Sequence, residues 1–160
     1  PDASALLGHL QEILELPDVT DILLLQSVWT IMRQRSGSRA FSKLKAIVAD
    51  QRRRCAYFAN EHHAECFVAR TPYEHRKMLG KAFAGVVDKF NVLPGHYDAV
   101  CRAAGWYSAF GAQGKGVIVL SESPLCREVA ASQGLVVMGW HAYLTTHHPS
   151  SPHLLGLYDS

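Results

Sequence analysis

Hydrophobic residues follow two alternating patterns along the chain. In residues 5–16, Leu and Ile side chains return every three or four positions, which places them on one face of a helix. Between such segments lie short continuous apolar runs such as Gly116–Leu120, which are typical of strands buried on both faces. The patterns predict helices over 5–16, 27–35, 40–50, 73–90, 97–110, 124–133 and 140–145, and strands over 22–25, 55–58, 116–120 and 135–138.

The order of these segments predicts an α/β fold. Strands separated by helices form a mostly parallel sheet covered on both sides, a three-layer α/β/α arrangement. Ligands of such sheets bind at the carboxyl ends of the strands. The residues just past the predicted strands are Gln26, Ser27, Asn60–His63 and Ser121–Ser123. Asp2 joins them if a first strand precedes Pro1, as we expect because the chain begins with Pro and not with Met.

Composition narrows the class of protein. The chain has 160 residues, 48% hydrophobic and 19% charged, which is typical of one soluble globular domain. A net charge of +2 is too small to indicate a surface that binds polyanions over its whole area. The apolar runs are too short to cross a membrane. The sequence also lacks the phosphate-binding loop that would indicate a small-molecule cofactor. Four Cys without a C-x-x-C pair indicate free thiols in a reducing compartment.

Several motifs, in order along the chain, resemble one family of RNA-processing domains. They are Pro1-Asp2, Leu25–Val28, Arg33–Ser36, Phe58–His63, Ala103–Tyr107 and a strand that ends at Ser121. Together they resemble the PIN domain of the RNase II-type catalytic exoribonuclease subunit of the eukaryotic RNA exosome. The expected domain covers residues 1–146 with a helical insertion near 73–94, followed by an irregular tail over 147–160.

This resemblance implies an endonuclease domain joined to a 3′–5′ exoribonuclease, found in nucleus and cytoplasm. RNA and the exosome ring subunits are the implied partners, with no membrane involved. The chemistry of the family uses about four carboxylates that hold Mg²⁺ or Mn²⁺, because these hard cations prefer oxygen ligands. A pair of such ions stabilises the attacking and leaving oxygens of a phosphodiester displacement.

The acidic positions implied by the resemblance are only partly filled. Asp2 occupies the first position, and Ile31 stands in the second. Tyr97 falls on the third with Asp98 beside it, and Ser123 falls on the fourth with Glu122 beside it. A slip of one residue turns a helical side chain by about 100°.

We therefore expect a degenerate metal site and a role in docking or RNA positioning. The alternative is an active divalent-metal-dependent endoribonuclease that cleaves single strands. Its catalytic residues are Asp2, Asp98 and Glu122, and Asp2 and Asp98 hold the metal. A small-molecule function unrelated to RNA is a third possibility, against which the sequence offers only the missing nucleotide fingerprint.

Two polar clusters lie outside these acids. Arg52, Arg53 and Arg54 form a basic run that contacts RNA phosphates or an acidic partner, or else is a solvated helix end. Asn60, Glu61, His62 and His63 could bind metal or RNA. However, adjacent His side chains on an extended segment point to opposite sides, which favours a structural or docking role.

Overall fold

The computed structural model describes residues 1–66, 89, 90, 92 and 94–149. Most of the insertion expected near 73–94, including the helix predicted over 73–90, lies outside the described residues. So does the part of the tail beyond residue 149.

The described chain alternates helices with very short strands. The helices are α1 (Ala3–Glu15), α2 (Gln26–Arg35), α3 (Gly37–Ala49), α5 (Pro94–Phe110), α6 (Pro124–Ser132) and α7 (Trp140–His147), with the 3₁₀ turns η1 (Gln51–Arg53) and η2 (Asn60–His62). The strands are β1 (Leu23–Leu25), β2 (Ala56–Phe58), β3 (Ile118–Leu120) and β4 (Val136–Met138). Each predicted element outside 73–90 is thus confirmed, within a few residues at its ends.

The main difference in boundaries is at the junction of α2 and α3. We expected a break over 36–38, but α3 begins at Gly37 directly after Ser36. Gly37 has a φ of 74°, a left-handed conformation that a residue without Cβ adopts at little cost. The Ser36 hydroxyl donates to the Met32 carbonyl oxygen at 2.6 Å and closes the last turn of α2. The chain therefore turns from one helix into the next without a loop.

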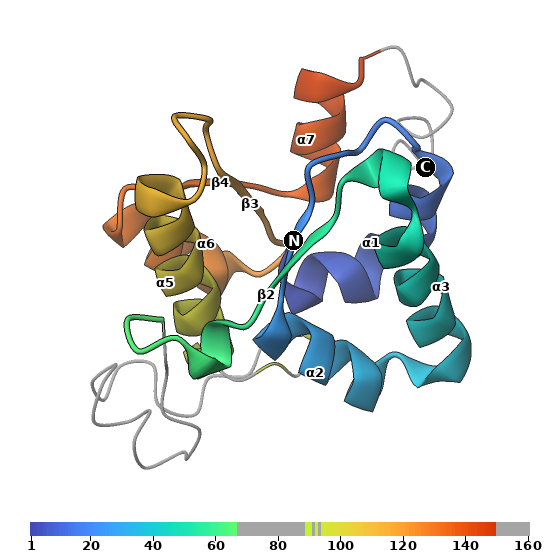
Figure 1. Cartoon of the computed structure of the whole chain (residues 1–160), viewed down its shortest axis with the longest axis horizontal. Helices are drawn as coiled ribbons and strands as arrows, with labels where there is room; N and C mark the ends of the chain where they lie inside the picture. The colour runs from blue at the N-terminus through green and yellow to red at the C-terminus, as the bar shows by residue number, and fades with distance from the viewer. Residues whose placement is uncertain (67–88, 91, 93, 150–160) are drawn as a thin grey trace.

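The described strands form two parallel pairs. Leu24 of β1 is in register with Tyr57 of β2, and Val119 of β3 is in register with Val137 of β4. In Figure 1 the start of the chain lies between the two pairs, with α5 and α6 on one side of it and α1, α2 and α3 on the other. The expected α/β architecture with parallel strands is confirmed.

An apolar cavity of about 500 Å³ lies between the two strand pairs. Residues 23–25 of β1 and 118–120 of β3 line it, together with Pro1 and side chains from the surrounding helices. The Asp2 amide donates to the Leu120 carbonyl oxygen at 2.9 Å, so the first residues lie beside the carboxyl end of β3. The structure does not test the strand that we predicted before Pro1.

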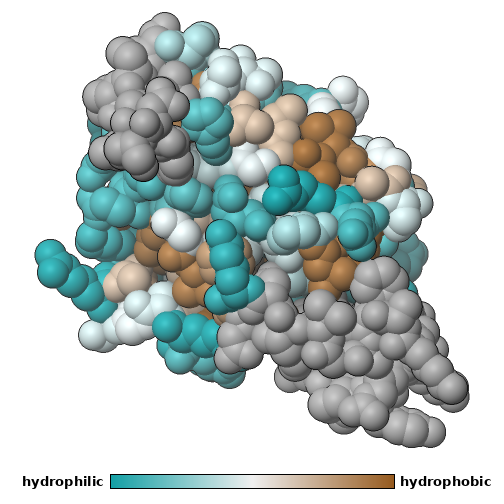
Figure 2. All heavy atoms as spheres, turned by 180° about the vertical axis from the view of Figure 1, so that it is seen from behind, coloured by the Kyte–Doolittle hydropathy of each residue, from teal (hydrophilic) through white to brown (hydrophobic). Residues whose placement is uncertain are grey.

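The remaining surface is mixed. Figure 2 shows separate hydrophobic patches divided by hydrophilic residues on the face seen from behind. None of the helices in the described part of the chain is both long and apolar enough to cross a membrane.

Candidate functional site

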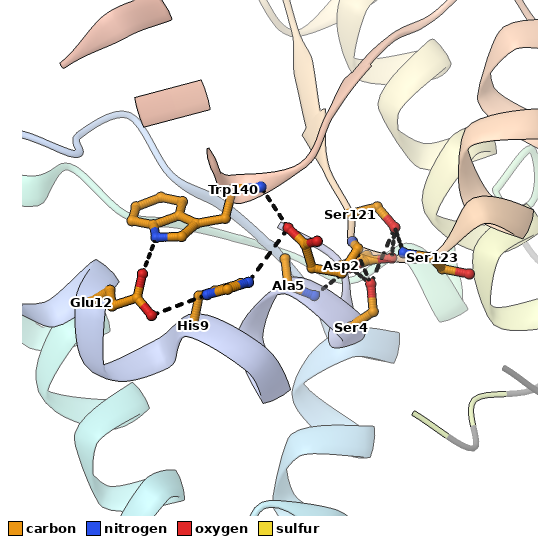
Figure 3. A network of polar contacts seen from close by, with 9 residues as sticks. Asp2, Ser4, Ala5, His9, Glu12, Ser121, Ser123 and Trp140 are labelled. Atoms are coloured by element: carbon orange, nitrogen blue, oxygen red, sulfur yellow. Dashed lines mark hydrogen bonds and ion pairs between the residues drawn. The ribbon is translucent and has the colours of Figure 1, made fainter. Parts of the chain in front are cut away.

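Asp2 lies at the start of α1 with its carboxylate fully enclosed. The residue has no exposed surface. One carboxylate oxygen, Oδ1, accepts hydrogen bonds from the Ser4 hydroxyl at 2.7 Å and the Ala5 amide at 2.9 Å. The other, Oδ2, accepts a bond from the Ser121 hydroxyl at 2.6 Å (Figure 3). Asp2 is therefore the N-cap of α1 and also fastens this helix to the end of β3.

The environment of Asp2 disfavours its charged form. Burial raises the pKa of the Asp2 carboxyl, and the hydrogen bonds from Ser121, Ala5 and Ser4 oppose this rise only in part. Its side-chain partners are neutral hydroxyls, and hydroxyls offset the lost hydration of a carboxylate less well than a guanidinium does. The hydrogen bonds of the Asp2 carboxyl thus favour a structural role, in which this side chain holds α1 in place.

Three serines join Asp2 at the carboxyl end of β3. The hydroxyl oxygens of Ser4 and Ser121 lie 3.2 Å apart. The Glu122 amide donates to the Ser4 hydroxyl at 2.9 Å, and the Ser123 amide donates to the Ser121 hydroxyl at 3.1 Å. The structure therefore brings Asp2 together with the segment Ser121–Ser123, two of the groups singled out by their places after strands.

Glu122 uses its carboxylate to hold α7. Its Oε1 accepts a hydrogen bond from the Trp140 amide at 2.6 Å and lies 3.5 Å from His9 Nε2. His9 Nδ1 is 3.1 Å from Glu12 Oε1, and the Trp140 indole donates to Glu12 Oε2 at 2.5 Å (Figure 3). Sequence reasoning missed His9, Glu12 and Trp140, because no local pattern connects α1 with α7.

Asp98 has a different partner from the other two acids. It lies on α5 with 4% of its surface exposed, and its Oδ2 accepts a hydrogen bond from Arg102 Nε at 2.9 Å. Tyr97, in the place of the third family acid, is fully buried. Ile31, in the place of the second, is a partly buried residue packed against the core.

Each of the three acids considered as metal ligands has hydrogen-bond partners of its own. Among the residues that the structure describes, no three His, Cys, Asp or Glu side chains are grouped so as to hold a metal ion. Mg²⁺ and Mn²⁺ bind several oxygen ligands at once. Both Asp2 oxygens already accept hydrogen bonds, while Glu122 caps α7 and Asp98 pairs with Arg102.

The three consecutive arginines have different environments. Arg53 is 3% exposed, and its guanidinium donates to the carbonyl oxygens of Ile13 at 2.8 Å and Leu14 at 2.6 Å. These carbonyls belong to the last turn of α1, whose free acceptors a cation satisfies. Burial therefore removes Arg53 from the proposed contact with RNA or a partner.

The neighbouring arginines reach the surface. Arg52 Nε lies 3.2 Å from an oxygen of Asp50, and Arg54 Nε donates to Asp21 at 2.8 Å. Both pairs are exposed ion pairs, which contribute little to stability. Only Arg52 and Arg54 of the run remain available for such a contact.

The Asn-Glu-His-His segment packs against α2 and α5. Asn60 is 1% exposed: its Oδ1 accepts a bond from the Ser27 amide at 3.1 Å, and its Nδ2 donates to the Ser27 hydroxyl at 3.0 Å. The His63 ring lies 4.4 Å from the Trp106 ring. His62 is exposed and Glu61 is partly buried. These contacts favour the structural interpretation for Asn60 and His63.

All four cysteines, which lie in the described part of the chain, have free thiols, and Cys66, Cys101 and Cys126 are buried. A hydrogen bond with Cys101, together with burial, raises the pKa of the Cys126 thiol well above its usual range. Since the thiolate is the reactive form, Cys126 is suited to packing and not to nucleophilic chemistry.

Comparison with known proteins identifies the fold. No protein-family model matches the sequence. Among solved structures, the chain is similar to the PIN domain of RRP44 from T. brucei, with a TM-score of 0.67 and 17% sequence identity. The match covers 98% of this chain and 85% of that chain. The chain therefore has a PIN-like α/β/α fold.

Proposed function

We propose that this chain is the PIN-like domain of an exosome-type ribonuclease in RNA processing and degradation. In this proposal its acidic site is degenerate, and the domain docks partners or positions RNA. The likeness to a PIN domain supports the class of domain. The motifs shared with the exosome subunit support the finer assignment. RNA and exosome ring subunits are the proposed partners, in nucleus and cytoplasm, without a membrane or a small-molecule cofactor.

The state of Asp2 is the observation that carries this proposal. A carboxylate that binds Mg²⁺ does so in its charged form and directs an oxygen lone pair at the ion. Asp2 accepts three hydrogen bonds, and burial raises its pKa. A metal at Asp2 would therefore compete with the donors that now connect Asp2 to α1 and to Ser121.

The alternative, an active endoribonuclease, needs two further rearrangements. Asp98 would have to leave Arg102, and Glu122 would have to leave the Trp140 amide. Each change removes a hydrogen bond of a carboxylate, worth about 1.5–3 kcal/mol. For this reason we favour the docking or RNA-positioning role.

Cleavage of a circular single-stranded RNA tests the proposal. A circle has no ends, so contaminating exonucleases do not contribute to the signal. Wild-type protein and the Asp2→Asn variant are compared with Mn²⁺ and with EDTA, and Asp18→Asn, at an exposed acid, is the matched control. We expect no cleavage that depends on Mn²⁺. Cleavage that requires both Mn²⁺ and Asp2 but not Asp18 would instead establish the endonuclease.

A further inference from the structure

Positive charge is concentrated in one part of the chain. Residues 26–54 contain eight Lys and Arg side chains and one Asp, a balance of +7, whereas the whole chain carries +2. These residues form α2, α3 and η1, and α2 packs directly against α3. Figure 1 shows the two helices on the same side of the molecule. The small net charge of the chain therefore conceals a basic region.

Three aromatic rings lie at the surface of this region. The Trp29 ring on α2 is 4.7 Å from the Phe41 ring on α3 and 6.4 Å from the Tyr57 ring on β2, both edge-on. Tyr57 is 51% exposed, whereas Trp29 and Phe41 are partly buried and pack on the core. We call Trp29, Phe41 and Tyr57 the aromatic cluster. Its two inner rings are fixed by packing, and its outer ring is open to solvent.

Cations are placed beside these rings. The Lys45 ammonium lies 5.0 Å from the centroid of the Phe41 ring. Arg33 follows Trp29 by four residues on α2, which puts both on the same helix face. Arg33 and Lys45 are exposed, and neither has an acidic partner among residues 1–66, 89, 90, 92 and 94–149. Their charges are therefore available to a ligand.

The chemistry of this surface matches a single-stranded nucleic acid. Base faces stack on aromatic rings, and Lys or Arg beside the rings contacts the phosphates. A folded duplex offers no open base faces, and an acidic peptide has no need of stacking partners. We propose that the aromatic cluster, with Arg33 and Lys45, is a contact surface for single-stranded RNA. This inference rests on the proposed role of the chain in handling RNA and names the surface that does so.

Fluorescence anisotropy with a labelled oligouridine of about 12 nucleotides tests the surface. Tyr57→Ala removes an exposed ring, and its matched control is Phe110→Ala, a ring on α5 that is 71% exposed. Loss of one stacked base lowers affinity by about 5-fold or more. We expect this loss for Tyr57→Ala and not for Phe110→Ala. Equal affinities of the two variants would overturn the proposal, and so would failure of the wild-type protein to bind the oligonucleotide.

The charge of the surface has its own test. Arg33→Ala is compared with Arg127→Ala, since both arginines are exposed helix residues. Removal of one phosphate contact lowers the slope of log affinity against log salt by about 0.7 for a single strand. Only Arg33→Ala is expected to lower it. If both variants keep the wild-type slope, the cations do not contact the RNA.

Glu61 allows a change in the opposite direction. Burial raises the pKa of the Tyr57 hydroxyl, and the charge of Glu61 lies near enough to raise this pKa further. Glu61→Gln removes repulsion against phosphates, so affinity is expected to rise at low salt and the gain to shrink at high salt. No gain at low salt would contradict the placement of RNA at this surface.

A protein partner is the competing occupant. If Tyr57→Ala abolishes binding to a protein subunit while oligouridine binding is unchanged, the surface docks protein and the proposal is wrong. The proposed function is tested separately, since the assay with circular RNA examines the acidic site through Asp2 and does not involve Tyr57. A negative result at the aromatic cluster thus leaves the degenerate-site proposal standing.

Discussion

Asp2 and Asp98 are two buried carboxylates with opposite solutions to the same problem. Asp2 has no exposed surface and is surrounded by neutral donors, two hydroxyls and one amide. Asp98 is 4% exposed and pairs with a cation, Arg102. Burial is costly to a charge, and a neutral donor offsets that cost less than a guanidinium does.

The difference teaches what each acid does for the fold. Asp2 connects two elements, because its partners come from α1 and from the residue after β3. Asp98 and Arg102 lie one turn apart on the same helix. Loss of Asp2 therefore affects tertiary structure, whereas loss of Asp98 affects one ion pair at the border of the core.

The largest expected effect is that of Asp2→Ala. The variant loses the N-cap, worth about 1 kcal/mol, and leaves the buried hydroxyls of Ser4 and Ser121 without their acceptor, at a further cost of about 1–3 kcal/mol. We expect the free energy of unfolding to fall by about 3 kcal/mol in urea denaturation. Asp18→Ala, at an exposed position, is the control. A loss below about 1 kcal/mol would contradict the structural role of Asp2.

The Asp98–Arg102 pair gives a smaller and asymmetric effect. The Arg102 side chain is 40% exposed and the Asp98 side chain is 6% exposed. After Asp98→Ala, water solvates the guanidinium, so we expect a loss of about 1 kcal/mol. After Arg102→Ala, a buried carboxylate is left unpaired, and we expect about 2 kcal/mol. Urea denaturation of both single variants and the double variant measures this, and equal losses would show that Asp98 is solvated as readily as Arg102.

The sequence predicted the elements better than the contacts between them. Helical periodicity and apolar runs located each described helix and strand, because both depend on residues close in sequence. The break between the second and third helices was predicted to extend to residue 38, but α3 starts at Gly37. The left-handed conformation of Gly37 turns the chain from α2 directly into α3. Local pattern also identified Ser121 as a residue beyond a strand.

Contacts between distant segments were not predictable. Glu12 and Trp140 are 128 positions apart, and nothing in either neighbourhood indicates the other. The three arginines 52–54 are identical in sequence, yet only Arg53 is turned towards α1. Which arginine is buried depends on the turn η1 and on Arg54, whose φ of 48° is left-handed. Such features follow from tertiary packing, which sequence patterns alone do not show.

A comparison across pH separates the charge of Asp2 from its hydrogen bonds. The Asn side chain of Asp2→Asn retains an oxygen that accepts hydrogen bonds from Ser4 and Ala5, and this side chain cannot ionise. Burial raises the pKa of Asp2 in the folded state. The stability that protonated Asp2 contributes is therefore fully present below its unfolded pKa of about 3.9, and it is lost as the pH rises to the folded pKa.

The free energy of unfolding of the wild type, relative to that of Asp2→Asn, should thus fall as the pH rises across this window. The fall is about 1.4 kcal/mol for each unit of difference between the folded and unfolded pKa, and the relative stability stays level at higher pH. Urea denaturation of both proteins from pH 3 to pH 8 measures the difference. A wild-type advantage that grows with pH would mean that the charged carboxylate is stabilised in the fold. Asp2 would then resemble Asp98, a carboxylate with a stabilising partner, and it would again be a candidate metal ligand.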